Sequence, residues 1–481
     1  MILSYLDFLL ISPEIILFLF ASFTLIINIF YENKKNNILF FSIIFILIIL
    51  LMIFYYQYIN KLFGTAFYDL LIIDKLTLFL KCVTTLVTLL SIIYGYDYIK
   101  NNIENNKGEF YVLIMFALIG QMLLISANNL VVIYLGIELM SLSLYPLIVI
   151  QKNNKLAIEA AVKYFILSLL SSGILLYGFS ILYGITGTLD INSMFTNISN
   201  FNKLYNFSFT FIIIGLIFKL GIVPFHMWMP DVYQGAPTII TSIISSGPKI
   251  AIITILFRLL NLFIEVDKDY ISTIILYLSI ASIILGNILA VMQSNFKRLL
   301  AYSAISHMGF VLLALANNNI EFALFYLISY LLTSIPCFGI IMYLSYKNFE
   351  FQNIRDFNKL YKYKPFLSFY ILMIMLSMAG IPPMIGFYAK LIIFKNLIDF
   401  GYTYITLIIA ISSVIGAYYY LNIIKIMYFD NIQSNYDGIL NIKDKNNFHL
   451  SKIILLLNFV LLLIISILPN LLLVTINKLY L

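Results

Sequence analysis

Apolar stretches long enough to cross a lipid bilayer follow one another along almost the entire chain, with short polar loops between them. An α-helix rises about 1.5 Å per residue, so about 20 apolar residues span the roughly 30 Å hydrocarbon core of a bilayer. Of the 481 residues, 62% are hydrophobic and only 11% are charged. This composition excludes a soluble globule and predicts an all-α polytopic membrane protein.

The apolar stretches predict about fourteen transmembrane helices in one membrane domain. No window resembles a cleavable signal or a soluble domain. The predicted helices cover residues 9–30, 37–56, 71–96, 110–126, 129–150, 157–183, 208–229, 237–260, 270–291, 299–316, 320–345, 366–398, 404–428 and 451–476.

The distribution of basic residues between the loops predicts the orientation of the chain. Most Lys and Arg residues of the loops follow odd-numbered helices, and the other loops and the tail carry only Lys61, Lys203, Lys268 and Lys478. Loops on the inner side of a membrane carry an excess of Lys and Arg. Both termini are therefore predicted to lie outside, with the odd-to-even loops in the cytoplasm or matrix.

Prolines interrupt two of the predicted helices in related ways. The seventh helix contains Gly221–Pro224, and the twelfth contains Ala379–Pro383. Pro224 and Pro383 lie 159 residues apart (383 − 224) in helices seven and twelve. A separation of five helices is odd, so the second copy is inverted in the membrane. Paired discontinuous helices in an inverted repeat are typical of transporter-like cores.

We therefore expect two inverted five-helix repeats, each containing a broken helix. Residues 1–110 hold helices one to three, and residues 110–260 hold helices four to eight as the first repeat. Residues 270–428 hold helices nine to thirteen as the second repeat. Residues 451–476 form the last helix, outside the repeat.

Charged side chains inside the predicted helices are the candidate functional residues, because a charge at bilayer depth costs at least a few kcal/mol. Glu138 lies near the middle of the fifth helix and Lys219 in the seventh. A carboxylate beside a buried lysine forms a site that changes protonation when its surroundings change slightly, as a proton relay requires. The alternatives are a neutral acid that only joins helices, for Glu138, and a static salt bridge, for Lys219.

Two further lysines lie too deep to reach a helix end. Lys249 lies midway along the eighth predicted helix, and Lys390 follows the double proline of the twelfth. With Lys219, they can form a row at one depth on different helices. The broken helices beside that row would admit the water that connects them.

Other candidates carry less specific signals. His226 and His307 could bridge lysines, because imidazole both donates and accepts near neutral pH, but a satisfied core histidine is the equal alternative. Glu159 and Lys163 are spaced i, i+4 and most simply form a local pair. Lys81 is deep in the third helix with no obvious partner.

Asp231 follows the break in the seventh helix and is predicted either to cap the eighth helix or to receive protons at the surface. Arg258 lies near a helix end and most simply anchors it at the membrane interface. The sequence has no phosphate-binding glycine loop, no Cys and His metal spacing, no Ser, His and Asp arrangement and no haem-attachment motif. Any redox chemistry is therefore expected on another chain.

Several stretches together resemble a known family. The segment from Phe218 to Pro237 resembles the seventh-helix signature of the antiporter-like subunits of respiratory complex I, most closely the branch of mitochondrial subunit 2 and bacterial chain N. The resemblance extends from about Gly120 to Phe400. Further stretches that carry it are Glu159–Phe165, Ser172–Gly178, Lys297–Ser303, His307–Gly309 and Ala379–Lys390.

The resemblance implies a fourteen-helix subunit of NADH:ubiquinone oxidoreductase that moves protons and carries no cofactor itself. NADH, FMN, iron–sulfur clusters and ubiquinone are expected on partner subunits. Glu138 and Lys219 would be the coupled pair, Lys249 the relay lysine and Lys390 the lysine that passes the proton onward. The expected partners are other membrane-arm subunits, including a neighbouring antiporter-like subunit, and membrane lipids, with no nucleic acid.

Rival interpretations stay open. A subunit of a multi-subunit cation/proton antiporter shares this fold, and a scaffold with inert ion pairs is a second rival. A solute carrier is disfavoured because no dedicated anion or sugar site is evident. Abundant Ile, Asn, Lys and Tyr and the lack of a targeting sequence predict the mitochondrial inner membrane, with a bacterial plasma membrane as the alternative and a plastid third.

Overall fold

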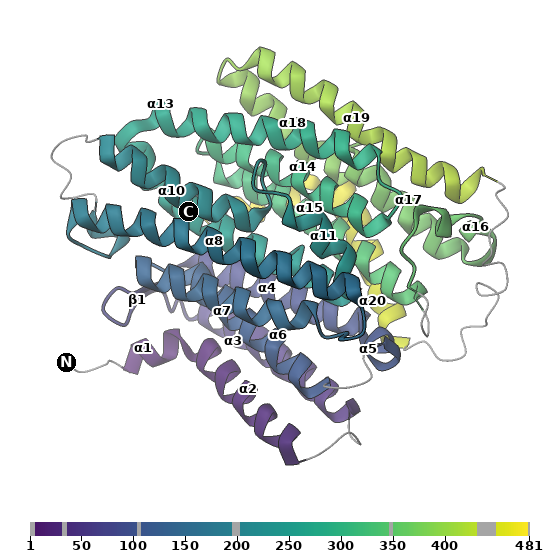
Figure 1. Ribbon diagram of the computed structural model, residues 1–481, viewed down its shortest axis with the longest axis horizontal. Helices are drawn as coiled ribbons and strands as arrows, with labels where there is room; N and C mark the ends of the chain where they lie inside the picture. The colour runs from purple at the N-terminus through teal and green to yellow at the C-terminus, as the bar shows by residue number, and fades with distance from the viewer. Residues whose placement is uncertain are drawn as a thin grey trace.

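A computed structural model describes residues 5–30, 36–102, 107–194, 203–345, 350–430 and 449–479 (Figure 1). Within these residues, twelve helices are long and apolar enough to cross a membrane, and two shorter apolar helices cover Ser12–Asn28 and Pro365–Ala379. All fourteen coincide with predicted helices. The predicted all-α polytopic membrane fold is therefore confirmed.

The N-terminal part contains helices and a small hairpin. The third predicted helix begins four residues later than expected, at Lys75, because Asp74 caps it. The Asp74 carboxylate accepts a hydrogen bond from the Thr77 amide at 2.7 Å, and the Thr77 hydroxyl accepts one from the Asp74 amide at 2.7 Å. The elements are α1 (Tyr5–Leu10), α2 (Ser12–Phe30), α3 (Asn36–Ile59), β1 (Gly64–Ala66), antiparallel β2 (Leu71–Ile73), α4 (Lys75–Tyr94) and α5 (Tyr96–Asn102).

The predicted helices four to nine follow. Helices eight and nine run into each other as α13, with non-helical backbone at Asp267 (φ −147°, ψ 82°), so the predicted loop between them is largely helical. The elements are α6 (Lys107–Ser126), α7 (Leu130–Ile148), α8 (Lys155–Thr186), α9 (Ile191–Met194), α10 (Lys203–Leu220), α11 (Trp228–Gly235), α12 (Thr238–Ile244) and α13 (Gly247–Val291).

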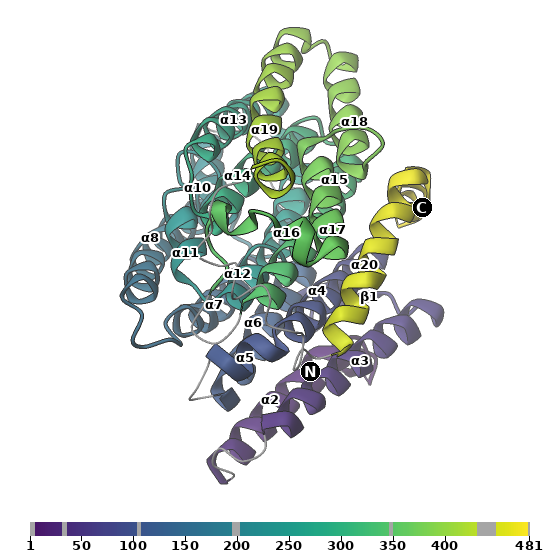
Figure 2. The same ribbon diagram turned by 90° about the vertical axis from the view of Figure 1, so that its right-hand side faces the viewer.

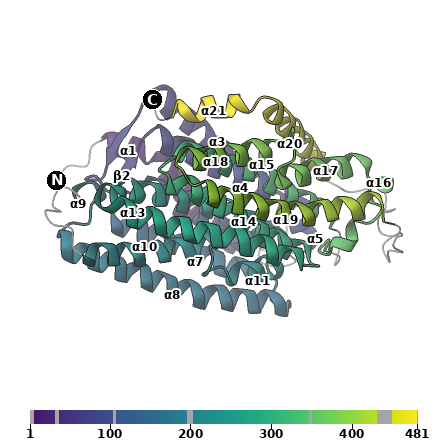
Figure 3. The ribbon, with the colours of Figure 1, turned by 90° about the horizontal axis from the view of Figure 1, so that it is seen from above.

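The last part of the chain completes the bundle. The predicted final helix is divided at Pro469 into α20 and α21, which lie along one edge of the molecule (Figure 3). The elements are α14 (Phe296–Ala316), α15 (Ile320–Leu344), η1 (Ile354–Phe357), α16 (Leu360–Tyr363), α17 (Pro365–Ala379), α18 (Ile385–Asp399), α19 (Thr403–Tyr428), α20 (His449–Ile467) and α21 (Pro469–Asn477).

The helices pack side by side in one bundle (Figures 1 and 2). The helices α2 and α3 lie at one end, α18 and α19 lie at the other, and α14 and α15 lie between them (Figures 1 and 2). The helix α20 packs against α4 and α15, so it joins the N-terminal helices to the second half. The predicted domain limits at residues 110, 260, 270 and 428 stay predictions.

Glycines allow close helix contacts at matching places in the two halves. A Cβ atom on Gly120 of α6 would lie 2.6 Å from the amide nitrogen of Met140 on α7. A Cβ atom on Gly286 of α13 would lie 2.9 Å from the amide nitrogen of Ser306 on α14. Helices in lipid depend on such small residues, because van der Waals packing replaces the hydrophobic effect between them.

Both predicted helix breaks are present. The helix α10 ends before Gly221 (φ +74°), and α17 ends before Gly380 (φ +81°). Glycine adopts this left-handed conformation without the steric cost that a Cβ atom imposes. Helix seven is therefore divided into α10 and α11, and helix twelve into α17 and α18.

A third break was not predicted. The eighth predicted helix divides at Ser245 and Ser246 into α12 and α13. Pro248 has no amide hydrogen to donate to the carbonyl of Ile244, four residues earlier, and its ring would clash with that carbonyl. The prediction of one continuous helix over 237–260 is therefore wrong. Lys249 lies in the first turn of α13 and not midway along a helix.

Gly120→Ala is expected to destabilise the protein by about 1–3 kcal/mol, because its methyl group overlaps the α7 backbone. Gly173→Ala is the matched control, since no atom lies within 4 Å of the position of its Cβ. Thermal unfolding of the detergent-solubilised protein measures both. Equal melting temperatures for the two variants would contradict the packing account.

Candidate functional site

Lys219 lies in the last turn of α10, where its buried ammonium group donates a hydrogen bond to the hydroxyl of Ser168 on α8. The indole nitrogen of Trp228 donates to the carbonyl of Phe218 at 2.9 Å and satisfies one carbonyl at the broken helix end. The negative end of the helix dipole favours a positive charge at this place. The break therefore places the Lys219 charge at a helix end that stabilises it.

Glu138 of α7 does not form the predicted direct ion pair with Lys219 among the described residues. Its Oε1 atom is buried and has no hydrogen-bond partner there. Ser168 occupies the hydrogen-bonding position that the prediction gave to Glu138. Glu138 and Lys219 therefore form no direct hydrogen bond or ion pair among the described residues.

Lys249 is 1% exposed and contacts two aromatic rings. Its Nζ donates to the hydroxyl of Tyr330 at 3.3 Å, lies 4.9 Å from the centroid of that ring, and lies 5.9 Å from the centroid of Tyr233. No carboxylate pairs with it in the part of the chain that the structure describes. Aromatic faces stabilise the ammonium, whereas the positive N-terminal end of α13 opposes it. These opposed effects suit a group that gains and loses a proton.

His307 of α14 lies beside Tyr330, with ring centroids 5.4 Å apart. Its Nδ1 is 2.8 Å from the hydroxyl of Tyr326, and its Nε2 is 3.1 Å from the hydroxyl of Tyr420. Both ring nitrogens are therefore hydrogen-bonded to groups that can donate or accept. Tyr330 therefore contacts both Lys249 and His307.

Lys390 of α18 is buried beside the break in helix twelve. Its Nζ donates to the carbonyls of Ala379 at 2.8 Å and Met378 at 3.3 Å, which are left free by the end of α17. The ring of Phe310 lies 5.8 Å from the same nitrogen. As at Lys219, a half-helix C-terminus stabilises the positive charge.

A small cavity lies between His307 and Lys390. It is lined by residues that include His307, Tyr326, Tyr330 and Lys390, and about 10 Å³ of it is open to the centre of a water molecule. This space is near the lower limit for one buried water. Lys249 therefore contacts Tyr330, and Tyr330, His307 and Lys390 line the same cavity.

The structure leaves two candidates outside these contacts. Lys219 has no hydrogen bond to Lys249 among the described residues. His226 is buried in the segment between α10 and α11, and its Nδ1 has no partner within the described ranges. The predicted bridging role of His226 stays a prediction.

Sequence analysis did not identify the hydroxyl groups of the site. Ser168 holds Lys219, and Tyr326, Tyr330 and Tyr420 surround His307. Tyr326 and Tyr330 are spaced i, i+4 in an apolar helix, so both face the same side. That spacing could have predicted a pair of hydroxyl groups on one face of the helix.

Lys81 has the partner that the sequence analysis did not find. Its Nζ lies 2.5 Å from Oε1 of Glu14 on α2, with side chains 1% and 5% exposed. Glu14 follows Pro13 at the start of the first apolar run, so its membrane depth was not evident. The pair fastens the first helix to the third, outside the repeat.

Asp231 of α11 does not cap the next helix, whose N-cap position is held by Pro237, and its predicted role in receiving protons stays a prediction. It accepts from Lys163 at 2.8 Å and from Arg298 at 2.8 Å, while Lys163 also pairs with Glu159 at 2.7 Å as predicted. Arg258, expected to be an interfacial anchor, pairs with Asp74 at 3.1 Å. No cluster of His, Cys, Asp or Glu suited to a metal occurs in the described ranges.

Broken helices that carry buried lysines define an antiporter-like class of membrane protein, and comparisons with known proteins agree. Residues 127–416, more than half of the chain, match the family model described as NADH:quinone oxidoreductase/Mrp antiporter, TM. The NADH-quinone oxidoreductase subunit N of Herminiimonas arsenicoxydans is 44% identical over 76% of this chain and 77% of its own. The chain therefore belongs to the subunit N family of these antiporter-like proteins, and the resemblance found in the sequence is confirmed.

Solved structures show the same fold. A chain of respiratory complex I from Thermus thermophilus, solved with bound aureothin, superposes with a TM-score of 0.81 and 26% identity, covering 96% of this chain and 98% of that one. A chain of the Mrp complex from Dietzia sp. superposes with a TM-score of 0.84 and 18% identity, covering 98% and 96%. The Mrp likeness concerns the fold alone.

Lys81→Met is expected to destabilise the protein by about 3–5 kcal/mol, because it leaves the Glu14 carboxylate buried without its partner. The double variant Lys81→Met/Glu14→Leu removes both charges and is expected to recover most of that loss. Thermal unfolding in detergent measures both proteins. A double variant as unstable as the single one would contradict this account of the pair.

Proposed function

We propose that this chain moves protons across the membrane as an antiporter-like membrane-arm subunit of NADH-quinone oxidoreductase. Membership of the subunit N family supports the assembly. The observation that carries proton movement is the contact series from Lys249 through Tyr330 and His307 to the cavity at Lys390. Every member is buried, and each can donate or accept a proton or hydrogen bond.

The transfer proceeds between neutral and charged forms of the same groups. Protonated Lys249 gives its proton to the Tyr330 hydroxyl, which passes its own proton by way of a water in the shared cavity to His307, and Lys249 becomes a neutral amine. The imidazolium of His307 then passes a proton to neutral Lys390 by way of the cavity, which has room for about one water. Each step moves one proton and leaves its donor ready to be charged again.

Glu138 and Lys219 regulate this series from outside it. The Glu138 charge would act on the Lys219 ammonium through space, because no direct hydrogen bond or ion pair joins them among the described residues. A shift of Glu138 toward or away from Lys219 changes how firmly the proton is held, since electrostatic interaction depends strongly on distance at low dielectric. Quinone reduction in a neighbouring module would drive that shift.

Redox groups are assigned to other chains of the assembly. NADH, FMN, iron–sulfur clusters and the quinone are placed on partner subunits, and ubiquinone is the quinone that the sequence resemblance implies. Neighbouring membrane-arm subunits are the direct partners.

The membrane is that of a respiratory assembly. The compared relatives are bacterial, which supports the plasma membrane in preference to the predicted mitochondrial inner membrane. A cation/proton antiporter subunit is the second candidate function, but the Mrp likeness supports only the fold. Sodium dependence of transport would favour that candidate.

Lys219→Met is expected to reduce proton translocation to below about a tenth of the native value, because it removes the charge through which Glu138 would act on the series, and buried charges interact strongly at low dielectric. Lys425→Met, at an exposed helix end, is the control and should pump normally. Membrane vesicles that contain the assembled complex allow proton uptake and NADH oxidation to be measured together. Full pumping by Lys219→Met would contradict the proposed function.

His307→Phe keeps the ring volume but removes both nitrogens that contact Tyr326 and Tyr420. We expect proton translocation to fall by about tenfold or more, because no imidazole then accepts the proton that Tyr330 passes on from Lys249. The same vesicles serve for the measurement. Unchanged pumping would show that protons take another path.

A further inference from the structure

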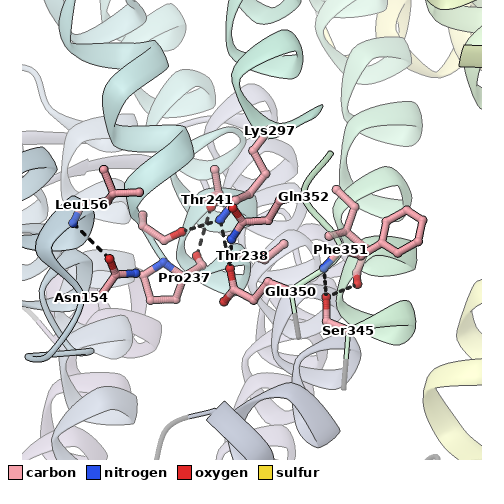
Figure 4. Close-up of polar contacts among 12 residues, drawn as sticks. Asn154, Leu156, Pro237, Thr238, Thr241, Lys297, Ser345, Glu350, Phe351 and Gln352 are labelled. Carbon is pink, nitrogen blue, oxygen red and sulfur yellow. Dashed lines mark hydrogen bonds and ion pairs between the residues drawn. The ribbon is translucent and has the colours of Figure 1, made fainter. Parts of the chain in front are cut away.

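A polar cluster lies where loops from distant parts of the chain meet, on the predicted inner side of the membrane (Figure 4). Glu350, in the segment after α15, pairs with Lys297 of α14, with 3.5 Å between Oε2 and Nζ. The Lys297 side chain is 1% exposed and that of Glu350 is 20% exposed. The hydroxyl of Tyr98 on α5 and the amide of Gln352 both donate to the Glu350 carboxylate.

The cluster holds the junction between α11 and α12 at two backbone atoms. Lys297 Nζ donates to the carbonyl of Ala236 at 3.0 Å. The amide of Thr238 donates to the hydroxyl of Tyr98 at 3.3 Å. Pro237 between them has no amide hydrogen, so these two contacts fix the only turn that connects the two helices. Both Lys297 and Tyr98 also contact the Glu350 carboxylate.

Glu350 keeps its negative charge at neutral pH. Burial alone would raise the pKa of its carboxyl, but the Lys297 ammonium and the hydrogen bonds from Tyr98 and Gln352 hold that pKa below its usual value. The cluster is therefore an ionised clamp and not a proton carrier. Removing the Glu350 charge would leave the buried Lys297 ammonium unpaired, which is strongly unfavourable.

The junction leads directly to the proton pathway. The helix α12 has seven residues, all buried, and so spans about 10 Å before the break that precedes Lys249. On the other side, α11 carries Tyr233, whose ring faces the Lys249 ammonium at 5.9 Å. A second clamp from Arg298 to Asp231 holds α11 to the same helix α14. Movement of the junction would thus displace Lys249 and Tyr233.

We propose that Glu350 is a positioning residue for proton transfer, which holds the α11–α12 junction through Lys297 and Tyr98 and thereby places Lys249 against Tyr330. This inference rests on the proposed function. The cluster around Glu350 also joins α5, the α11–α12 junction and α14 at one point.

The test uses membranes that contain the assembled complex and compares Glu350→Gln with Glu350→Asp. Glu350→Gln keeps the shape and removes the charge, and the ratio of protons moved to NADH oxidised is expected to fall by about fivefold or more, since small displacements of reacting groups cost up to about 100-fold. Glu350→Asp keeps the charge and should retain at least about half of the ratio. Glu109→Gln, at an exposed carboxylate at the start of α6, is the control and should behave as the native protein.

A native ratio in Glu350→Gln, an equal fall in both Glu350 variants, or a similar fall in Glu109→Gln would each overturn the proposal. If Glu350→Gln does not assemble, Tyr98→Phe removes one arm of the clamp without changing charge, and its ratio is expected to fall by about twofold or more. A native ratio there would equally overturn the clamp. Lys219→Met separates the two proposals, because a native ratio in that variant contradicts the proposed function itself.

Discussion

The cost of placing lysine ammonium groups in a medium of low dielectric governs the rest of this structure. Each buried lysine requires a local arrangement that stabilises its charge, and helix ends supply it twice. Lys219 lies at the C-terminal end of α10, and Lys390 binds the carbonyls released at the end of α17. Lys249 instead lies at a helix N-terminus and relies on the rings of Tyr330 and Tyr233. The broken helices therefore allow Lys219 and Lys390 to carry a charge inside the membrane.

The breaks also link distant parts of the chain, because side chains from other helices must satisfy the backbone groups that each break leaves free. A helix that ends inside the membrane leaves carbonyl and amide groups that lipid cannot satisfy. Trp228 satisfies one such carbonyl from within the break, and Lys297 satisfies that of Ala236 from another helix. The cluster at Glu350 is thereby tied to Lys249, since it acts on the turn that leads into α12. Packing of α6 on α7 and of α13 on α14 through glycine keeps the two halves rigid around these sites.

The sequence was sufficient for the fold because hydropathy and proline are local signals. Runs of apolar residues located all fourteen helices, and glycine with proline located the breaks at Gly221 and Gly380. The break at Ser246 was not predicted, because a single proline such as Pro248 is often tolerated within a membrane helix. The ion-pair partners of buried lysines could not be predicted from such local signals. Glu14 for Lys81 and Glu350 for Lys297 lie 67 and 53 residues from their lysines (81 − 14 and 350 − 297), and only tertiary packing brings them together.

The central claim is that buried lysines change protonation while the assembly turns over. Infrared difference spectroscopy of the complex with ¹⁵N-labelled lysine, recorded on addition of NADH, measures this directly. The account predicts lysine N–H bands that change during turnover and that lose a component in a Lys249→Met variant. Lysine bands that stay constant while protons are pumped would contradict it.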